Sequence, residues 1–173
     1  MRITFELEPA DIEHFEAALA RCHRAVRDAD EADVLDAAKM TLDRLCAGRL
    51  PKYIRERLSV VQRLILLLED EEWSLPQPER TGVIETLVYF SDPDDLIDDE
   101  VAVIGLLDDA IMLELLLRRQ RRVLRAWERF RAFRAQLGEA RTPAERVEVA
   151  RKLARRRGAL HRAMRRPTRR AGA

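Results

Sequence analysis

The chain has 173 residues, 47% of them hydrophobic and 36% charged, and its net charge of +1 conceals two opposite parts. Residues 1–110 hold 12 Lys and Arg against 26 Asp and Glu, whereas residues 111–173 hold 20 against 5. This length suits one domain with a buried core. Because no apolar run approaches the roughly 20 residues that cross a bilayer, the sequence excludes a transmembrane helix.

The N-terminal third of the chain predicts two helices. Residues 2–7 alternate between apolar and polar side chains, which predicts an extended segment without a visible partner strand. Pro9 then opens a helix that runs to about Val26. A second helix is predicted from about Ala32 to Ala47, where Gly48 ends it. Its expected buried face comprises Leu35, Ala38, Met40, Leu42 and Leu45.

The middle of the chain predicts two further helices around a loop. A third helix starts at Pro51 and ends in the acidic run from Glu69 to Glu72. Its expected buried face comprises Tyr53, Ile54, Leu58, Val61, Leu64, Ile65 and Leu68. The stretch SLPQPER, residues 74–80, contains two prolines and predicts a loop. A fourth helix then covers about residues 83–90.

The last third predicts one long helix and one basic helix. The long helix runs from Leu106 to about Leu137, and because its first part is apolar nearly all round we expect it to be central. Its later part carries one apolar stripe, Val123, Trp127, Phe130 and Leu137. Gly138 ends it, and Thr142, Pro143 and Glu145 form a capping box that starts the last helix.

These elements predict an all-α fold, a single-domain bundle of about five to six helices with a basic C-terminal helical arm. We expect residues 1–137 to form the helical domain and residues 138–173 to form the arm and its tail.

One segment, from Tyr89 to Leu117, crowds acidic residues between two apolar runs. Its acidic residues are Asp92, Asp94, Asp95, Asp98, Asp99, Glu100, Asp108, Asp109 and, within the second apolar run, Glu114. The segment resembles the YkvA-like family, a domain of unknown function found mostly in bacteria. The matching positions are Tyr89, Phe90, Pro93, Asp95, Leu96, Ile97, Asp99, Val103, Gly105, Leu107, Asp108 and Asp109. Asp98, Glu100 and Ala102 depart from the pattern. The likeness covers roughly residues 1–137 and implies a soluble helical fold but almost no activity.

The acidic segment allows two interpretations. Asp95 and Asp99 are four residues apart and share a helical face, and Asp108, Asp109 and Glu114 follow across a glycine turn. Four or five converging carboxylates would hold Mg²⁺ or Mn²⁺, and a bound metal would activate water for hydrolysis. The alternative, which we favour, is that these carboxylates cap helices or pair with arginines of the basic helices. No cofactor is then expected, and a divalent metal is the alternative.

Other catalytic patterns are absent from the sequence. It contains no glycine-rich phosphate loop, nucleophile elbow or Cys/His cluster, and the histidines His14, His23 and His161 are scattered. Cys22 and Cys46 lack metal-ligand spacing, so we expect buried thiols in a reducing cytosol. We therefore expect a binding protein rather than an enzyme.

The basic arm is the second candidate for function. On the long helix just before the arm, Arg129, Arg131 and Arg134 are interleaved with Trp127, Phe130 and Phe133, a combination that can serve nucleic-acid stacking or an anionic lipid surface. The helical spacing of Trp127 and Phe130 favours a core position for both instead. A purely structural interpretation is also open, in which the basic helices lie against the acidic part of the same chain or of a second copy.

The sequence therefore predicts a non-catalytic helical interaction or regulatory module with an acidic body and a basic arm. A protein partner is expected, with a homo-oligomer as one form of it. The alternatives are a metal-dependent enzyme built on the acidic segment and a binder of nucleic acid or anionic membrane through the arm. The expected location is the cytoplasm, with peripheral association at the inner membrane under the lipid alternative.

Overall fold

The computed structural model describes residues 29–48, 50–91 and 105–165, and in addition residues 13, 17, 20–22, 24 and 26. In the last long range the side chains are described from Leu113 onward. The helices are α2 (Glu31–Cys46), α3 (Lys52–Glu69), α4 (Gln77–Ser91), α5 (Gly105–Leu137) and α6 (Pro143–Arg165). No strand occurs in these ranges, which confirms the predicted all-α bundle.

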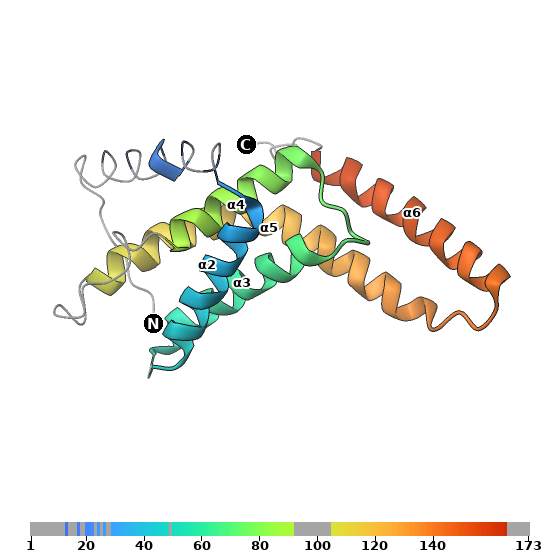
Figure 1. Ribbon diagram of the computed structural model, residues 1–173, viewed down its shortest axis with the longest axis horizontal. Coiled ribbons are helices and arrows are strands. Elements are labelled where there is room, and N and C mark those ends of the chain that lie inside the picture. The colour runs from blue at the N-terminus through green and yellow to red at the C-terminus, as the bar shows by residue number, and fades with distance from the viewer. Residues whose placement is uncertain are drawn as a thin grey trace, which may run out of the picture.

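The long helix α5 is central, as its apolar sequence predicts. Helices α3 and α4 pack against it, and α2 packs across α3 and α4 (Figure 1). Beyond this group α5 continues and turns back into α6, so that the two form an antiparallel hairpin at one end of the molecule (Figure 1). At 1.5 Å per residue α5 is about 50 Å long. It therefore reaches from the body of the bundle to the tip of the hairpin.

The ends of these helices follow local chemistry. The side chain of Asp30 caps α2, because its Oδ1 accepts a hydrogen bond from the Ala32 backbone nitrogen at 2.8 Å. The predicted capping box is confirmed at α6, where the Glu145 backbone nitrogen donates to Thr142 Oγ1 and the Thr142 nitrogen donates to Glu145 Oε2, each at 3.1 Å. Gly138 ends α5 with a φ of 65°, a conformation that favours glycine.

The predicted loop at residues 74–80 is wrong in its second half. Helix α4 begins at Gln77, and the Arg80 backbone nitrogen donates to the Pro76 carbonyl oxygen at 2.9 Å, closing the first turn. Pro78 is tolerated there because the first turn of a helix needs no internal backbone donors. The two prolines therefore mark a helix start where the sequence reasoning placed a loop.

Three residues predicted to be buried are exposed. Met40 is 74% exposed. Ala38 and Leu42 are four residues apart and face the core from one side of α2, so Met40, two residues from each, points to the opposite side. Tyr53, in the first turn of α3, is 38% exposed. Cys46 is an exposed free thiol at the end of α2, whereas Cys22 is buried as predicted.

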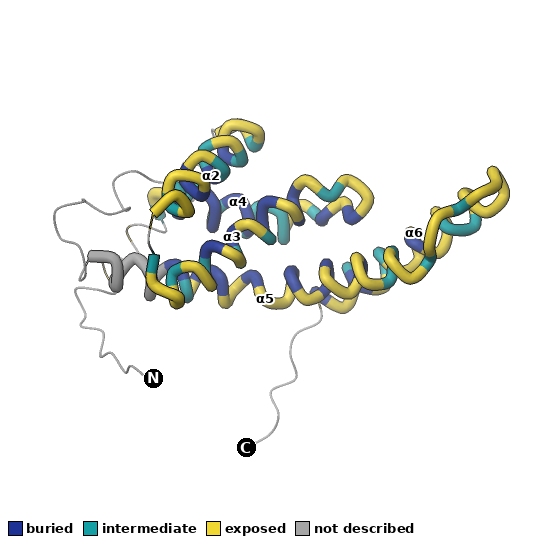
Figure 2. Tube along the Cα trace, turned by 90° about the horizontal axis from the view of Figure 1, so that it is seen from below, coloured by how far each residue is buried: buried dark blue, intermediate teal, exposed yellow. Residues whose placement is uncertain are grey.

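Trp73, in the connection between α3 and α4, lies at the junction of the body and the hairpin. Its side chain is fully buried. Its ring lies 5.2 Å from that of Phe130 on α5 and meets the His161 ring on α6 edge-on at 4.4 Å. Trp73 therefore joins three segments that are far apart in the sequence, and Figure 2 shows the otherwise largely exposed hairpin continuing beyond the body.

Truncating Trp73 to alanine is expected to destabilise the fold by about 3–5 kcal/mol, because a fully buried indole leaves a large cavity. Chemical denaturation at pH 7 measures the loss. Leu66→Ala is the matched control, since Leu66 is 45% exposed, and it is expected to cost far less. Equal losses in the two variants would contradict the central position of Trp73.

Candidate functional site

The most distinctive surface of the described chain is the α5–α6 hairpin, which we define as residues 113–165 and call the arginine hairpin. It carries 17 basic residues against five acidic ones, Glu114, Glu128, Glu139, Glu145 and Glu148. The basic residues are Arg118, Arg119, Arg121, Arg122, Arg125, Arg129, Arg131, Arg134, Arg141, Arg146, Arg151, Lys152, Arg155, Arg156, Arg157, Arg162 and Arg165. Such a surface attracts anions.

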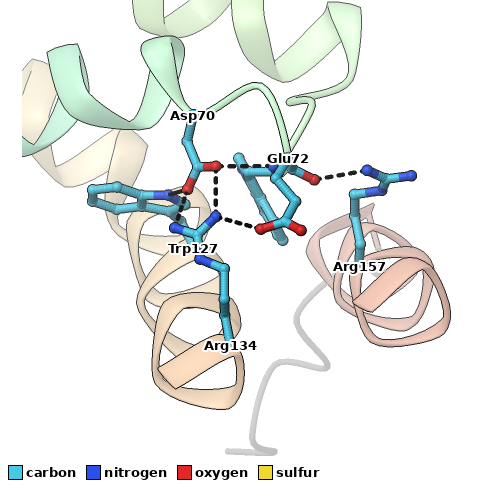
Figure 3. A network of polar contacts seen from close by, with 6 residues as sticks. Asp70, Glu72, Trp127, Arg134 and Arg157 are labelled. Carbon is cyan, nitrogen blue, oxygen red and sulfur yellow. Dashed lines mark hydrogen bonds and ion pairs between the residues drawn. The ribbon is translucent and has the colours of Figure 1, made fainter. Parts of the chain in front are cut away.

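Asp70, the C-cap residue directly after α3, fixes the hairpin to the body. Arg134 of α5 grips its carboxylate with both terminal nitrogens, each at 2.9 Å, and Trp127 Nε1 donates to Oδ2 at 2.8 Å (Figure 3). The Trp73 backbone nitrogen donates to Oδ1 at 3.1 Å. A two-pronged arginine contact combines energy with a fixed orientation, so this carboxylate sets the position of α5 along α3.

Residues that follow Asp70 extend this anchor to α6. Glu72 Oε2 accepts a second hydrogen bond from Arg134 at 2.8 Å, and the Glu72 carbonyl oxygen accepts one from Arg157 at 2.7 Å (Figure 3). Near the other end of α6, Arg165 lies 3.3 Å from Glu79 of α4. Both helices of the hairpin are therefore tied to the body by charged contacts.

The anchor perturbs the ionisation of Asp70. Burial disfavours its charged form, but the hydrogen bonds from Arg134, Trp127 and the Trp73 backbone outweigh burial and hold the pKa of Asp70 below its usual value. The same contact with Asp70, opposed by burial and assisted by Glu72, raises the pKa of Arg134. Asp70 is therefore ionised throughout the neutral and mildly acidic range.

His161 occupies the opposite situation beside Trp73. Burial lowers the pKa of its imidazole, and the neighbouring Arg157 and Arg165 act in the same direction, while Glu79 and the Trp73 backbone act against them. Its Nε2 is buried with no hydrogen-bond partner in the described ranges. The folded chain therefore favours a neutral imidazole at this position.

The first half of the hairpin meets α3 through shared ion pairs. Glu114 of α5 lies 2.7 Å from Arg118, 3.3 Å from Arg121 and 3.3 Å from Arg57 of α3. Further along, Glu128 of α5 lies 2.6 Å from Arg63 of α3. Since three arginines share one carboxylate, positive charge remains in excess on this side of α5.

The second half of the hairpin presents arginines on the outer side of α6. Arg151, Arg155 and Arg162 are spaced by four and seven residues, so they share one helical face, and all three are exposed. Glu148 lies 3.7 Å from Arg151, whereas Arg155 and Arg162 have no acidic partner among the described residues. This face is free to contact a partner.

The aromatic residues among these arginines belong to the core. Trp127 is 2% exposed and Phe130 is fully buried, which confirms the interpretation of both as core residues. Phe133 is half-buried beneath Arg156, whose guanidinium lies 5.5 Å from the ring centre. Trp127 and Phe130 therefore offer no stacking surface to a nucleobase.

The four aspartates of the predicted metal site fall outside what the structure describes in full, whereas Glu114 is described and pairs with arginines. Asp95 and Asp99 lie outside the described residues, as do the other acidic positions from Asp92 to Glu100. Asp108 and Asp109 belong to the first turns of α5, but their side chains lie outside the described part. No group of three or more potential ligands occurs among the described side chains. The metal hypothesis stays a prediction.

Sequence reasoning anticipated the kind of contact that holds the hairpin but did not name the residues that make it in the described part of the chain, while the aspartates it did name are untested there. It expected an Asp to pair with an arginine of the basic helices, and placed that Asp in the acidic segment. The residues that do so are Asp70 and Arg134. A usable signal was present: Asp70 follows directly on an apolar helix and precedes a tryptophan in a proline-rich connection.

Comparison with known proteins does not assign the chain to a family. Neither the protein-family models, nor the curated proteins, nor the solved structures contain a match to this chain. The resemblance of residues 89–109 to the YkvA-like family therefore stays a prediction. Among the described residues, no helix combines the length and the apolar character needed to cross a membrane.

Asp70→Asn is expected to cost about 2–3 kcal/mol at pH 7, because it removes a charge-assisted pair from a carboxylate that is only 9% exposed. Since the folded pKa of Asp70 is depressed, its contribution is present above about pH 4 and is lost as the pH falls through the folded pKa. Denaturation curves from pH 7 to pH 2 should show that the free energy of unfolding falls less steeply with decreasing pH in the variant than in the wild type. Asp36→Asn, at a 76% exposed side chain, is the control and should change little.

His161→Gln is expected to flatten the stability profile between pH 7 and pH 5. In the wild type the unfolded chain binds a proton on His161 near pH 6.5 while the folded chain resists it, so stability falls as the pH drops through that value. Denaturant unfolding at half-unit intervals measures both profiles. Parallel profiles in the two proteins would show that His161 titrates normally.

Proposed function

We propose that this protein is a non-catalytic helical interaction module that binds an acidic segment of a partner protein on its arginine hairpin. The observation that carries the proposal is the excess of exposed arginines over carboxylates on the hairpin, most clearly at Arg155 and Arg162 of α6. Arginine suits this role because its planar guanidinium binds carboxylates in a two-pronged manner.

The anchor at Asp70 supports the same proposal. A binding surface gains affinity when its side chains and backbone are already ordered before the partner arrives. Arg134 and Arg157 are used inside the molecule, where they hold α5 and α6 against the body. The remaining arginines are then presented on two fixed helices instead of a mobile tail.

Several features favour a protein partner over a nucleic acid or a membrane. The aromatic residues Trp127 and Phe130 are buried, and glutamates such as Glu148 interrupt the basic surface, where they would repel a continuous phosphate backbone. The large apolar residues exposed on the hairpin are Leu115 and Val147, on different helices. Two isolated side chains form no apolar face for insertion into lipid.

The finer expectations belong to the same proposal. Two cysteines without a disulfide, Cys22 and Cys46, are in keeping with a reducing cytoplasm. Membership of the YkvA-like family rests on the motif at residues 89–109 and would place the module among proteins with a related helical domain.

The triple charge reversal Arg151→Glu, Arg155→Glu and Arg162→Glu is expected to weaken binding of an acidic peptide at least tenfold, because it inverts the outer face of α6. Fluorescence anisotropy with a labelled glutamate-rich peptide at 50 and 150 mM salt measures the affinity. The control reverses three exposed basic residues of the body, Arg44, Lys52 and Arg55, and should change the affinity less than threefold.

The same assay separates the alternatives. A labelled single strand, a duplex of about 20 base pairs and vesicles of anionic phospholipid replace the peptide in parallel titrations. Tight binding of a nucleic acid or vesicle without binding of the acidic peptide would overturn the protein-partner proposal. So would equal loss of peptide binding in the hairpin and body variants.

A further inference from the structure

An open groove runs along the contact between α3 and α5, away from the outer face of α6. Its volume is about 320 Å³, at the small end of the range for sites that hold small molecules. Arg63 lines it from α3, and Arg118, Arg121 and Arg125 line it from α5. Four arginine residues therefore line one groove.

The charges around this groove do not balance. Glu114 is shared by Arg57, Arg118 and Arg121, and Glu128 is engaged by Arg63. Arg125 has no partner among the described residues. Four lining arginines, together with Arg57 beside the groove, thus accompany two carboxylates, which leaves a local excess of three positive charges.

The two glutamates give the groove order as well as charge. Each long arginine side chain loses conformational freedom when it binds a ligand, and an existing ion pair has already restricted it. Glu114 is only 23% exposed and holds three guanidinium groups in a defined arrangement. The shared carboxylate leaves further N–H donors of these arginines available, since each guanidinium carries five.

From this arrangement we infer that the groove between α3 and α5 is a binding site for a phosphate monoester. A monoester carries close to two negative charges at neutral pH and three strong acceptor oxygens, which match the excess charge and the surplus donors. A phosphodiester carries one charge and fewer free oxygens, so it matches less well. The site is distinct from the outer face of α6 and goes beyond the proposed function.

The inference is tested with phenyl phosphate, using isothermal titration calorimetry at pH 7.5 and 150 mM salt. Methyl phenyl phosphate, a diester with one charge, is the matched probe. We expect the monoester to bind at least tenfold more tightly than the diester. Its binding should also weaken as the pH falls below about 6, where the second phosphate proton returns. Absence of monoester binding at millimolar concentration, or equal binding of the diester, would overturn the inference.

Two variants locate the site. Arg125→Gln removes the unpaired guanidinium of the groove and should weaken monoester binding at least tenfold, whereas Arg155→Gln, on the outer face of α6, should leave it within twofold. Both residues are exposed, so melting curves should confirm intact folding. Equal weakening by both variants would show diffuse attraction to the whole hairpin and would overturn the site, while leaving acidic-peptide binding untouched.

The source of the phosphate is read from two further probes in the same assay. A phosphoserine peptide that binds more tightly than phenyl phosphate would assign the groove to a phosphorylated protein segment. A nucleoside monophosphate that does so would assign it to a nucleotide. Both results support the monoester site, provided that Arg125→Gln abolishes the gain.

Discussion

The contact between Asp70 and Arg134 is the constraint on which the rest of the arrangement depends. These residues are separated by 64 positions in the sequence, and their pairing fixes the end of α3 against the second half of α5. Trp127 and the Trp73 backbone complete the hydrogen bonding of the same carboxylate. A buried charge is tolerated only when it is paired and hydrogen-bonded. Loss of either partner therefore leaves the other as an unpaired buried charge. This satisfied carboxylate is therefore the central one of the contacts that position the hairpin on the body.

The same junction divides the arginines of the hairpin into structural ones and exposed ones. Arg134 and Arg157 turn inward to Asp70 and Glu72, and Trp73 fills the space between α5 and α6. The arginines that are not needed for this contact, including Arg125, Arg155 and Arg162, remain on the surface. Some of the arginines in the basic part of the sequence thus form ion pairs inside the fold, and the others stay exposed and can bind a partner. That surplus supports both a peptide-binding face on α6 and a phosphate site beside α3.

Much of the fold could be predicted from local patterns, because helix ends and apolar stripes are encoded within a few residues. The capping box at Thr142 and Glu145, the glycine end at Gly138 and the core stripe through Trp127 and Phe130 are examples. Local patterns fail where a residue's face depends on the exact helical angle, as for Met40, or where proline suits both a loop and a helix start, as at Pro78. The sequence around Asp70 carries a local signal for that residue, but its pairing with Arg134 was beyond such reasoning, since no local pattern selects one partner among so many arginines.

The measurement that tests this account most directly is hydrogen exchange of the backbone amides in the wild type and in Arg134→Gln. If the Asp70–Arg134 contact holds the hairpin, amides of α6 should exchange much faster in the variant while those of α2 keep their relative protection. This result would show that α6 detaches before the body unfolds. Unchanged protection of α6, or an equal loss of protection in α2 and α6, would contradict the account.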